Sequence, residues 1–269
     1  MRFGMSSLSA VLIPLLIVLS GCSVKEDRSG CPCVLMLDLS GLDADRFPSV
    51  VLSAVSDDGI LFSTTFDGAG YEDLHQLMVP KKTRIISVTG VEDEYVSFQD
   101  INGREDGFGL LVPYGSDCPP VHMFTGEVDV SGETDTVTVN LHKNHCKMRI
   151  KLTSESQTDF EIEVKGNYCG YGIGGELISG SFSNIPEIGP DGKRTVCLPR
   201  QGDSSLVMEL VDEDGQVRNF AIGEYIAYTG YDWTEENLRD IDVTIDFIKT
   251  ELVISVSDWG ESISIDVVL

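Results

Sequence analysis

Short apolar stretches alternate with turn residues along most of the chain. In residues 34–40, Leu35, Leu37 and Leu39 share one face, while Asp38 and Ser40 bring polarity to the other. This period-two pattern is typical of a β-strand with one buried side. Similar stretches recur every 8 to 12 residues or so, separated by glycine, proline and aspartate. The pattern therefore predicts a mainly β protein.

The expected strands fall into two series that meet near residue 144. The first series comprises residues 34–40, 50–55, 60–66, 74–79, 84–91, 110–112, 122–130 and 135–141. The second comprises residues 146–152, 160–164, 176–178, 194–198, 206–211, 217–222, 241–247, 252–256 and 263–268. We expect the apolar end, residues 263–269, to be the chain's own last strand; a strand offered to a partner is the alternative. Helix is expected only at residues 233–238, where Thr234, Glu235 and Glu236 supply a cap and an acidic first turn.

Two β-sandwiches of similar size fit this series best, because short strands with regular turns are typical of that architecture. We predict an N-terminal β-sandwich domain over residues 33–144 and a C-terminal one over residues 145–269. Residues 22–32 are polar and are expected to form a tether.

The beginning of the chain predicts export and lipid attachment. Residues 10–19 form an apolar run that contains Pro14, and a run this short cannot span a bilayer, which needs roughly 20 residues. Residues 19–22, Leu-Ser-Gly-Cys, resemble the lipobox of bacterial lipoproteins. We therefore expect a lipoprotein signal peptide over residues 1–21 and lipidation of Cys22, where two or three acyl chains such as palmitate give stable attachment. An ordinary signal peptide with an incidental cysteine is the alternative.

The residues after Cys22 indicate the destination. Ser23 stands where aspartate commonly retains such lipoproteins at the inner membrane, so the cell outer membrane is expected. The sequence Lys25, Glu26, Asp27 resembles the signal that sends lipoproteins of the Bacteroidetes to the cell surface. A solvated charged linker would look similar.

The charge balance excludes two classes of partner. Forty-four acidic residues against 19 basic ones give a net charge of −25. Nucleic acid and anionic lipid surfaces would repel such a chain, so no nucleic-acid partner is expected.

Six cysteines remain once Cys22 is assigned to lipid. An even number in an exported chain fits a disulfide framework, and six thiols allow 15 pairings that the sequence cannot separate. We expect one or two bridges, with the remaining thiols free. The candidates are Cys31, Cys33, Cys118, Cys146, Cys169 and Cys197.

Three motifs resemble functional sites, but none has the residues around it that such a site requires. Residues 170–175 match a dinucleotide fingerprint, but a strand follows where that motif needs a helix, so residues 166–175 are interpreted as a glycine-rich loop. His142, His145 and Cys146 alternate faces on a strand-like segment and cannot converge on one ion. Residues 212–215 resemble half of a calcium loop and are better explained as a hairpin turn. No metal and no cofactor are therefore expected.

No catalytic constellation is present in the sequence. A nucleophile elbow is missing, and the four histidines give no arguable triad. We therefore do not expect an enzyme.

Four segments in order carry a family resemblance. Residues 31–33 lead into the leucine-rich strand, residues 141–150 read Leu-His-Lys-Asn-His-Cys-Lys-Met-Arg-Ile, residues 238–242 read Leu-Arg-Asp-Ile-Asp, and residues 253–259 read Val-Ile-Ser-Val-Ser-Asp-Trp. With the lipobox, they resemble the FimB/Mfa-type fimbrial anchor subunits of the Bacteroidales, which belong to type V fimbriae. The resemblance covers essentially the whole chain after the signal peptide, and the order of the motifs carries it.

The resemblance implies two tandem transthyretin-like β-sandwich domains and a role in cell adhesion. Such anchors sit at the base of the fimbrium, tethered to the outer membrane by lipid, and they hold the fibre and limit its length. The partner would be a fimbrial shaft subunit, bound by strand addition to an open sheet edge. The alternative function is a carbohydrate-binding surface lipoprotein of a glycan-uptake system, which is also built of β-sandwiches.

Overall fold

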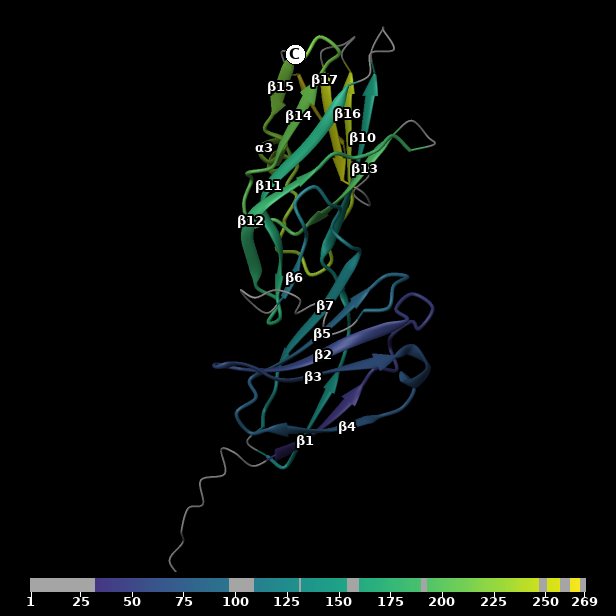
Figure 1. Ribbon diagram of the computed structural model, residues 1–269, viewed down its shortest axis with the longest axis vertical. Coiled ribbons are helices and arrows are strands. Elements are labelled where there is room, and N and C mark those ends of the chain that lie inside the picture. The colour runs from purple at the N-terminus through teal and green to yellow at the C-terminus, as the bar shows by residue number, and fades with distance from the viewer. Residues whose placement is uncertain are drawn as a thin grey trace, which may run out of the picture.

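The structure, a computed structural model, describes residues 32–96, 109–130, 132–153, 160–189, 193–246, 251–256 and 262–266. Strands dominate these residues and form four sheets. The sheets are arranged as two groups along the long axis of the molecule, a lower group that contains β1 and an upper group that contains β10 (Figure 1). The prediction of a mainly β fold is confirmed. No helix in the described ranges has the length and apolar character needed to cross a bilayer.

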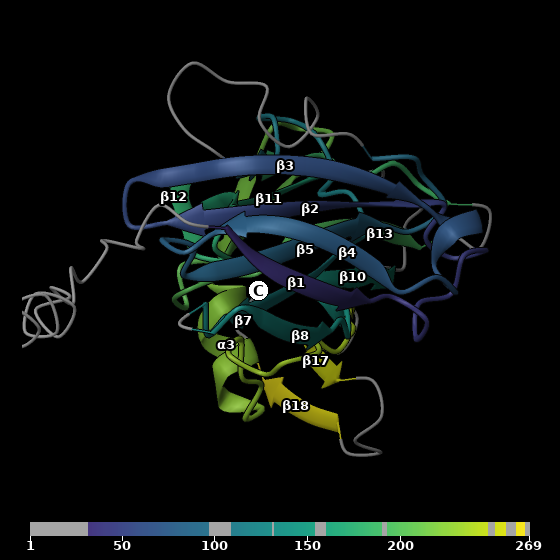
Figure 2. The same cartoon turned by 90° about the horizontal axis from the view of Figure 1, so that it is seen from below.

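The lower group consists of two sheets that face each other. Their strand orders are β4-β1-β8 and β3-β2-β5-β7-β9. Seen from below, β1 and β4 cross in front of β2 and β5 (Figure 2). A short 3-10 helix, η1 (Gly68–Gly70), follows β3. The strands are β1 (Pro32–Asp38), β2 (Ser49–Ser56), β3 (Gly59–Asp67), β4 (His75–Pro80), β5 (Ile85–Val91), β7 (Val121–Glu127), β8 (Thr134–Thr138) and β9 (His142–Lys143).

The core of the lower group comes directly from the alternation seen in the sequence. Leu35 and Leu37 on β1 are fully buried, and they join one apolar cluster with Leu52 of β2 and Ile86 of β5. Burying side chains of this size is worth about 1.5 to 3 kcal/mol each. The predicted inward face of the first strand is confirmed.

The upper group also consists of two sheets. Their orders are β13-β10-β16-β17-β18 and β12-β11-β14-β15, with β6 paired to β11. One helix, α3 (Ile222–Tyr228), contacts β14. The strands are β6 (Gly109–Leu111), β10 (His145–Thr153), β11 (Glu161–Gly172), β12 (Leu177–Asn184), β13 (Arg194–Pro199), β14 (Val207–Val211), β15 (Val217–Phe220), β16 (Ile241–Asp246), β17 (Glu251–Val256) and β18 (Ser262–Asp266).

The two groups repeat one pairing pattern. In each group the first long strand has an antiparallel neighbour on one side and a parallel neighbour on the other: β4 and β8 flank β1, and β13 and β16 flank β10. The sheet of the upper group continues beyond β16 with β17 and β18, whereas the sheet of the lower group ends at β8. In the described residues, β18 therefore pairs within its own chain, as expected for residues 263–266.

The predicted glycine-rich loop at residues 166–175 is wrong in its extent. β11 continues through Gly172, with two register shifts, and only a short turn separates it from β12. Gly170 allows β11 and β6 to approach each other closely, because a Cβ at this position would lie 2.2 Å from the carbonyl oxygen of Leu110 in β6. Glycine is the residue that permits such backbone proximity.

The predicted helix at residues 233–238 is also wrong, and helix appears instead at α3. The hydroxyl and backbone N–H of Thr234 donate to the Asp232 carboxylate at 2.7 and 2.8 Å. Nη1 of Arg200 donates a hydrogen bond to the carbonyl oxygen of Glu235 at 2.7 Å. Hydrogen bonds to side chains therefore replace those of a helical turn. In α3, by contrast, Ile222 and Ile226 are buried one turn apart.

The stretch from β6 to β7 crosses between the two groups. β6 joins a sheet of the upper group and β7 joins a sheet of the lower group. Side chains from this stretch, including Leu110 and Cys118, belong to the apolar cluster of the upper group. The domain boundary between residues 144 and 145 stays a prediction, and the signal peptide over residues 1–21 lies outside the described residues.

Candidate functional site

The lipidation residue Cys22 and the tether up to residue 31 lie outside the described residues. Lipid attachment therefore stays a prediction at this point.

The described cysteines are free thiols, which corrects the expectation of bridges among them. They are Cys33, Cys118, Cys146, Cys169 and Cys197. Burial raises the pKa of Cys33 and of Cys118, and it raises the pKa of Cys146 to about 12. These thiols are packed as small apolar side chains. A bridge through Cys31 stays a prediction, because Cys31 is outside the described residues.

Two of the sequence motifs meet at the point where the groups join. β10 and β16 are parallel partners, which brings residues 141–150 beside residues 238–242. Asp240 accepts hydrogen bonds from the ammonium of Lys143 at 2.5 Å and the backbone N–H of Lys147 at 3.0 Å. Arg149 donates from Nε to Asp242 at 2.7 Å. Hydrogen bonds and ion pairs thus join these two motifs, which are far apart in the sequence, at one junction.

Asn144 is held at this junction by contacts from both groups. Its backbone N–H donates to the carbonyl of Val121 in β7 at 3.1 Å. The hydroxyl of Tyr171 in β11 donates to its backbone carbonyl, and Nε of Arg200 donates to its side-chain oxygen at 3.1 Å. The connection between the groups is therefore fixed by hydrogen bonds rather than left as a free linker.

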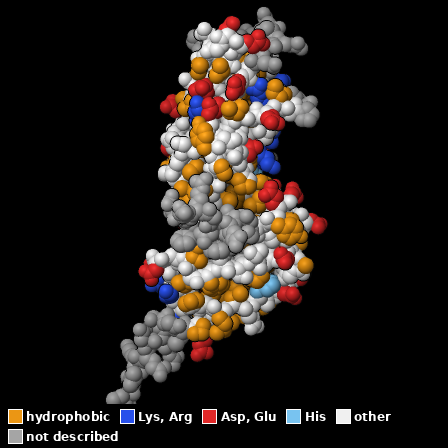
Figure 3. Space-filling model, viewed as in Figure 1, with side chains coloured by type: hydrophobic (Ala, Val, Ile, Leu, Met, Phe, Trp, Pro, Cys, Tyr) orange, Lys and Arg blue, Asp and Glu red, His pale blue; other side chains and the backbone are white. Residues whose placement is uncertain are grey.

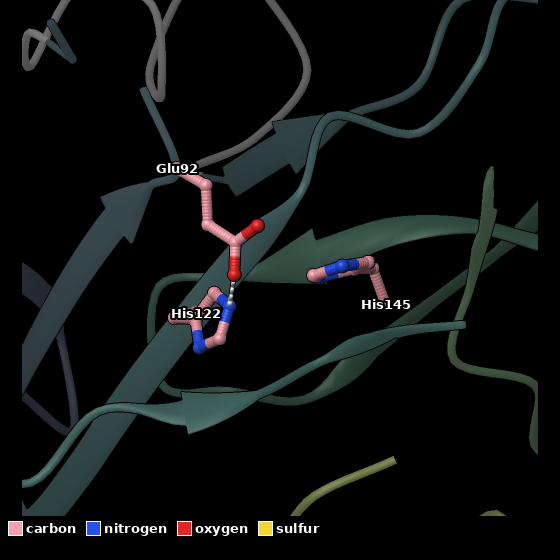
Figure 4. Close-up of side chains that lie close together, drawn as sticks. All are labelled: Glu92, His122 and His145. Atoms are coloured by element: carbon pink, nitrogen blue, oxygen red, sulfur yellow. Dashed lines mark hydrogen bonds and ion pairs between the residues drawn. The ribbon is translucent and has the colours of Figure 1, made fainter. Parts of the chain in front are cut away.

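The predicted geometry of His142, His145 and Cys146 is confirmed in that their side chains diverge. His142 lies 3.2 Å from a carboxylate oxygen of Glu236, and Cys146 is buried in the apolar cluster of the upper group. His145 instead lies close to two residues of the lower group, Glu92 and His122 (Figure 4).

One potential ligand atom from each of Glu92, His122 and His145 lies within 4.8 Å of the others. Glu92 follows β5, His122 is in β7, and His145 begins β10. The antiparallel pairing of β5 with β7 and the bond from Asn144 to Val121 bring them together. The cluster cannot be predicted from the sequence, because its three residues are far apart in the chain and belong to no common motif.

The two imidazoles are buried, Glu92 is partly exposed, and the three groups interact electrostatically. Oε1 of Glu92 lies 2.8 Å from Nε2 of His122, and Arg46 also contacts this carboxylate. Burial is the main cause that lowers the pKa of His122 to about 4. Burial alone would raise the pKa of Glu92, but hydrogen bonds from Arg46 and His122 lower it to about 2. Burial also lowers the pKa of His145. At neutral pH the two imidazoles are uncharged and the carboxylate is ionised.

Acidification is expected to destabilise the fold through His122. Its pKa is about 4 in the folded protein against an ordinary 6.5, so the unfolded chain binds more protons between these values. The stability is complete above this window and is lost as the pH falls through it. Between about pH 7 and about pH 5 we expect His122 to account for a loss of about 2 kcal/mol in the free energy of unfolding.

Urea denaturation at both pH values, without added metal ions, measures this loss. His122→Gln should reduce the difference by about the amount assigned to His122, while His145, whose pKa burial also lowers, still contributes to what remains. Glu92, Arg46 and Lys147, which lie near these two rings, stay in place. An unchanged difference in the variant would contradict the assignment.

The outer strands β3 and β4 of the lower group form an edge rich in apolar side chains. Leu74 and Met78 are 55% and 62% exposed, and Phe66 of β3 contacts His75 of β4 with 4.4 Å between ring centroids. Phe62, on the same strand as Phe66, is only partly buried. Hydrophobic side chains gather over the lower group in the region of β3 and β4 (Figure 3). We call this region the β3/β4 edge.

The edge at β8 differs in chemistry from the β3/β4 edge. β8 has the sequence Thr-Asp-Thr-Val-Thr, and only Val137 is buried. The carboxylate of Asp135 accepts hydrogen bonds from the backbone N–H groups of Thr136 at 2.8 Å and Asp129 at 3.0 Å. A charged side chain that occupies main-chain donors protects a strand edge against pairing.

Comparison with known protein families shows to which family the chain belongs. The family model described as "Fimbrillin-A associated anchor proteins Mfa1 and Mfa2" matches residues 58–264. The chain belongs to this family. The match covers more than half of the chain and runs through both groups of sheets, so the resemblance identified from the sequence motifs is confirmed.

Solved structures share the fold of this Mfa2-family chain. The fimbrial anchor protein Mfa2 from Porphyromonas gingivalis is 10% identical, with a TM-score of 0.57, and the match covers 85% of this chain and 98% of that chain. A structure from Bacteroides thetaiotaomicron, described as "putative polysaccharide binding proteins", is 13% identical with a TM-score of 0.57, and the match covers 87% of this chain and 98% of that chain. At such identities the likeness shows the fold alone. No match was found among curated proteins.

Family membership associates the chain with fimbriae and with the cell surface. The matched family and the two structures are described as anchor or binding proteins, not as enzymes.

Proposed function

We propose that the protein is a surface lipoprotein that anchors a fimbrium to the outer membrane. In this proposal Cys22 carries the lipid, residues 22–32 form the tether, and the two predicted β-sandwich domains hold the fibre. The match of residues 58–264 to the fimbrial anchor family is the observation that carries the proposal. The strongly acidic chain has no charge complementarity to anionic lipid, so a covalent lipid suits its attachment better than a charged surface would.

We propose further that the adjacent shaft subunit binds by strand addition at the β3/β4 edge and that this contact limits fibre length. β3 and β4 are the last strands of their sheets in the described residues, so each has one side without a paired strand. The exposed Leu74 and Met78 would contact side chains of an added strand. The alternative edge at β8 already uses Asp135 to occupy main-chain donors. Main-chain bonds would supply affinity and the apolar side chains specificity.

Placing a charge on β4 is expected to weaken this contact without unfolding the protein. Met78→Lys changes a side chain that is 62% exposed, and a lysine on an edge strand discourages pairing. We expect cells carrying this variant to retain several-fold less fimbrial material than the wild type. Shearing the fimbriae from cells and quantifying the shaft subunit in the cell-bound and released fractions measures the effect.

Val217→Lys is the matched control, because Val217 is 54% exposed and lies on β15, the last strand of a sheet in the upper group. This variant should retain fimbriae at the wild-type level. Equal retention by both variants would rule out the β3/β4 edge as the docking site.

Carbohydrate binding is the second candidate function. A pocket lined by Tyr231, Trp233, Arg200 and Asp203 combines aromatic and polar groups, as sugar sites do. However, Tyr231 is only 7% exposed, and Arg200 is engaged by backbone carbonyls. The anchor role therefore has the stronger support. Binding of purified protein to a glycan array, lost in Trp233→Ala, would favour the second candidate.

A further inference from the structure

We propose that Glu92, His122 and His145 form a binding site for a divalent transition-metal ion, with Zn²⁺ as the best match. The ion would link the lower group of sheets to the upper group. This goes beyond the anchor function and departs from the sequence-based expectation that no metal is bound. That expectation concerned His142, His145 and Cys146, a different set of residues.

The separation of the three side chains suits an ion after a small adjustment. Their ligand atoms lie within 4.8 Å of one another. Zinc binds histidine nitrogen and carboxylate oxygen at about 2.0 to 2.2 Å, so ligand atoms around a tetrahedral ion lie roughly 3.4 Å apart. Rotation of the Glu92 side chain, which comes from the turn after β5, can supply most of this contraction.

His145 is already oriented as a ligand. Its Nδ1 lies 3.1 Å from the carbonyl oxygen of Val121 and must donate a proton to it, because a carbonyl can only accept. The neutral ring therefore carries its free lone pair on Nε2. This nitrogen is fully buried and has no hydrogen-bond partner. The ring extends toward Glu92 and His122 (Figure 4).

Such an arrangement is typical of metal-ligating histidines, in which a second hydrogen bond fixes the tautomer. A buried polar atom without a partner otherwise costs about 1 to 3 kcal/mol. An ion at Nε2 of His145 would remove that cost.

A positive group already lies beside the other two ligand atoms, which contact each other directly. Nη2 of Arg46 contacts Oε1 of Glu92 and lies 3.2 Å from Nε2 of His122. A cation bridging these two atoms would replace the guanidinium, and Nε2 of His122 would have to lose the proton that it donates to Glu92, which leaves the neutral ring in its other tautomer. The Arg46 side chain is 48% exposed, so it can turn into solvent when an ion enters. Lys147, whose ammonium lies 4.0 Å from Oε2 of Glu92, is a second competing charge.

The ligand set indicates the class of ion. Two imidazole nitrogens and one carboxylate oxygen suit zinc and its neighbours in the first transition series, whereas magnesium and calcium prefer oxygen ligands alone. Three protein ligands leave a fourth position for water or for a group from a partner. Because β5 and β7 belong to the lower group and β10 to the upper group, binding would stabilise the junction between them.

Isothermal titration of the full-length, untagged protein in detergent with zinc chloride tests the proposal, after metal has been removed with a chelator. We expect one saturable site per chain and a rise in the melting temperature. Glu92→Gln and His145→Gln should each weaken zinc binding by at least about 10-fold. Arg46→Gln removes the competing charge and should strengthen zinc binding. Because Arg46 is half exposed, this gain is testable even if His145→Gln fails to fold.

His142→Gln is the matched control, since His142 is three residues from His145 but faces Glu236. Its zinc affinity should equal that of the wild type. Absence of a saturable site in both the wild type and Arg46→Gln would overturn the proposal. Equal affinities for the wild type and Glu92→Gln would overturn it as well.

Discussion

Cells that carry Cys22→Ala are expected to lose nearly all of the protein from the outer membrane and to shed their fimbriae. Each buried methylene of an acyl chain contributes about 0.8 kcal/mol, and two or three chains together give stable attachment. The variant would keep no chain, and the acidic body has no charge complementarity to anionic lipid. Labelling with a palmitate analogue, followed by fractionation of membranes and medium, measures the change.

Cys31→Ala is the matched control, because it removes a nearby cysteine but leaves the lipobox intact. It should label with palmitate and remain in the membrane fraction. Wild-type protein that carries no label, or a Cys22→Ala variant that stays in the membrane, would contradict lipid attachment at Cys22.

Gly170→Ala is expected to destabilise the upper group by about 3 kcal/mol, which is the scale of a steric clash in a packed region. The new Cβ would lie 2.2 Å from the carbonyl oxygen of Leu110 and 3.0 Å from the Cα of Leu111. Both are backbone atoms, so β6 must move away from β11 for the methyl group to fit. For a chain of this size the melting temperature should fall by about 6 to 12 °C.

Gly41→Ala provides the comparison, since nothing lies within 4 Å of the added Cβ at that position. Its melting temperature should stay close to that of the wild type. Thermal unfolding followed by circular dichroism measures both variants. A Gly170→Ala protein as stable as Gly41→Ala would show that β6 and β11 do not approach as closely as described.

Local patterns were sufficient to predict much of this fold. The alternation that places Leu35 and Leu37 on one face is a property of neighbouring residues, and both are buried on β1. Turn residues such as Gly59, which adopts a positive φ of 116°, marked the hairpin between β2 and β3. Strand positions could therefore be inferred without knowledge of their partners.

Features that depend on contacts between distant residues could not be predicted in this way. The glycines of β11 are typical of a flexible loop when only the sequence is considered, and their role in the strand depends on the pairing of β11 with β6. Helix α3 has only two buried residues on its inner face, Ile222 and Ile226, too few for a periodic signal, although its first turn includes a third, Gly223. The cluster of Glu92, His122 and His145 exists only because strand pairing brings three separate segments together.

Immunogold electron microscopy with an antibody to this protein tests the anchor function most directly. In wild-type cells we expect label at the membrane end of each fimbrium, and in cells that lack the protein we expect longer fimbriae that detach into the medium. Label along the shaft or at the tip, or fimbriae of unchanged length and attachment in the deletion strain, would contradict the anchor function.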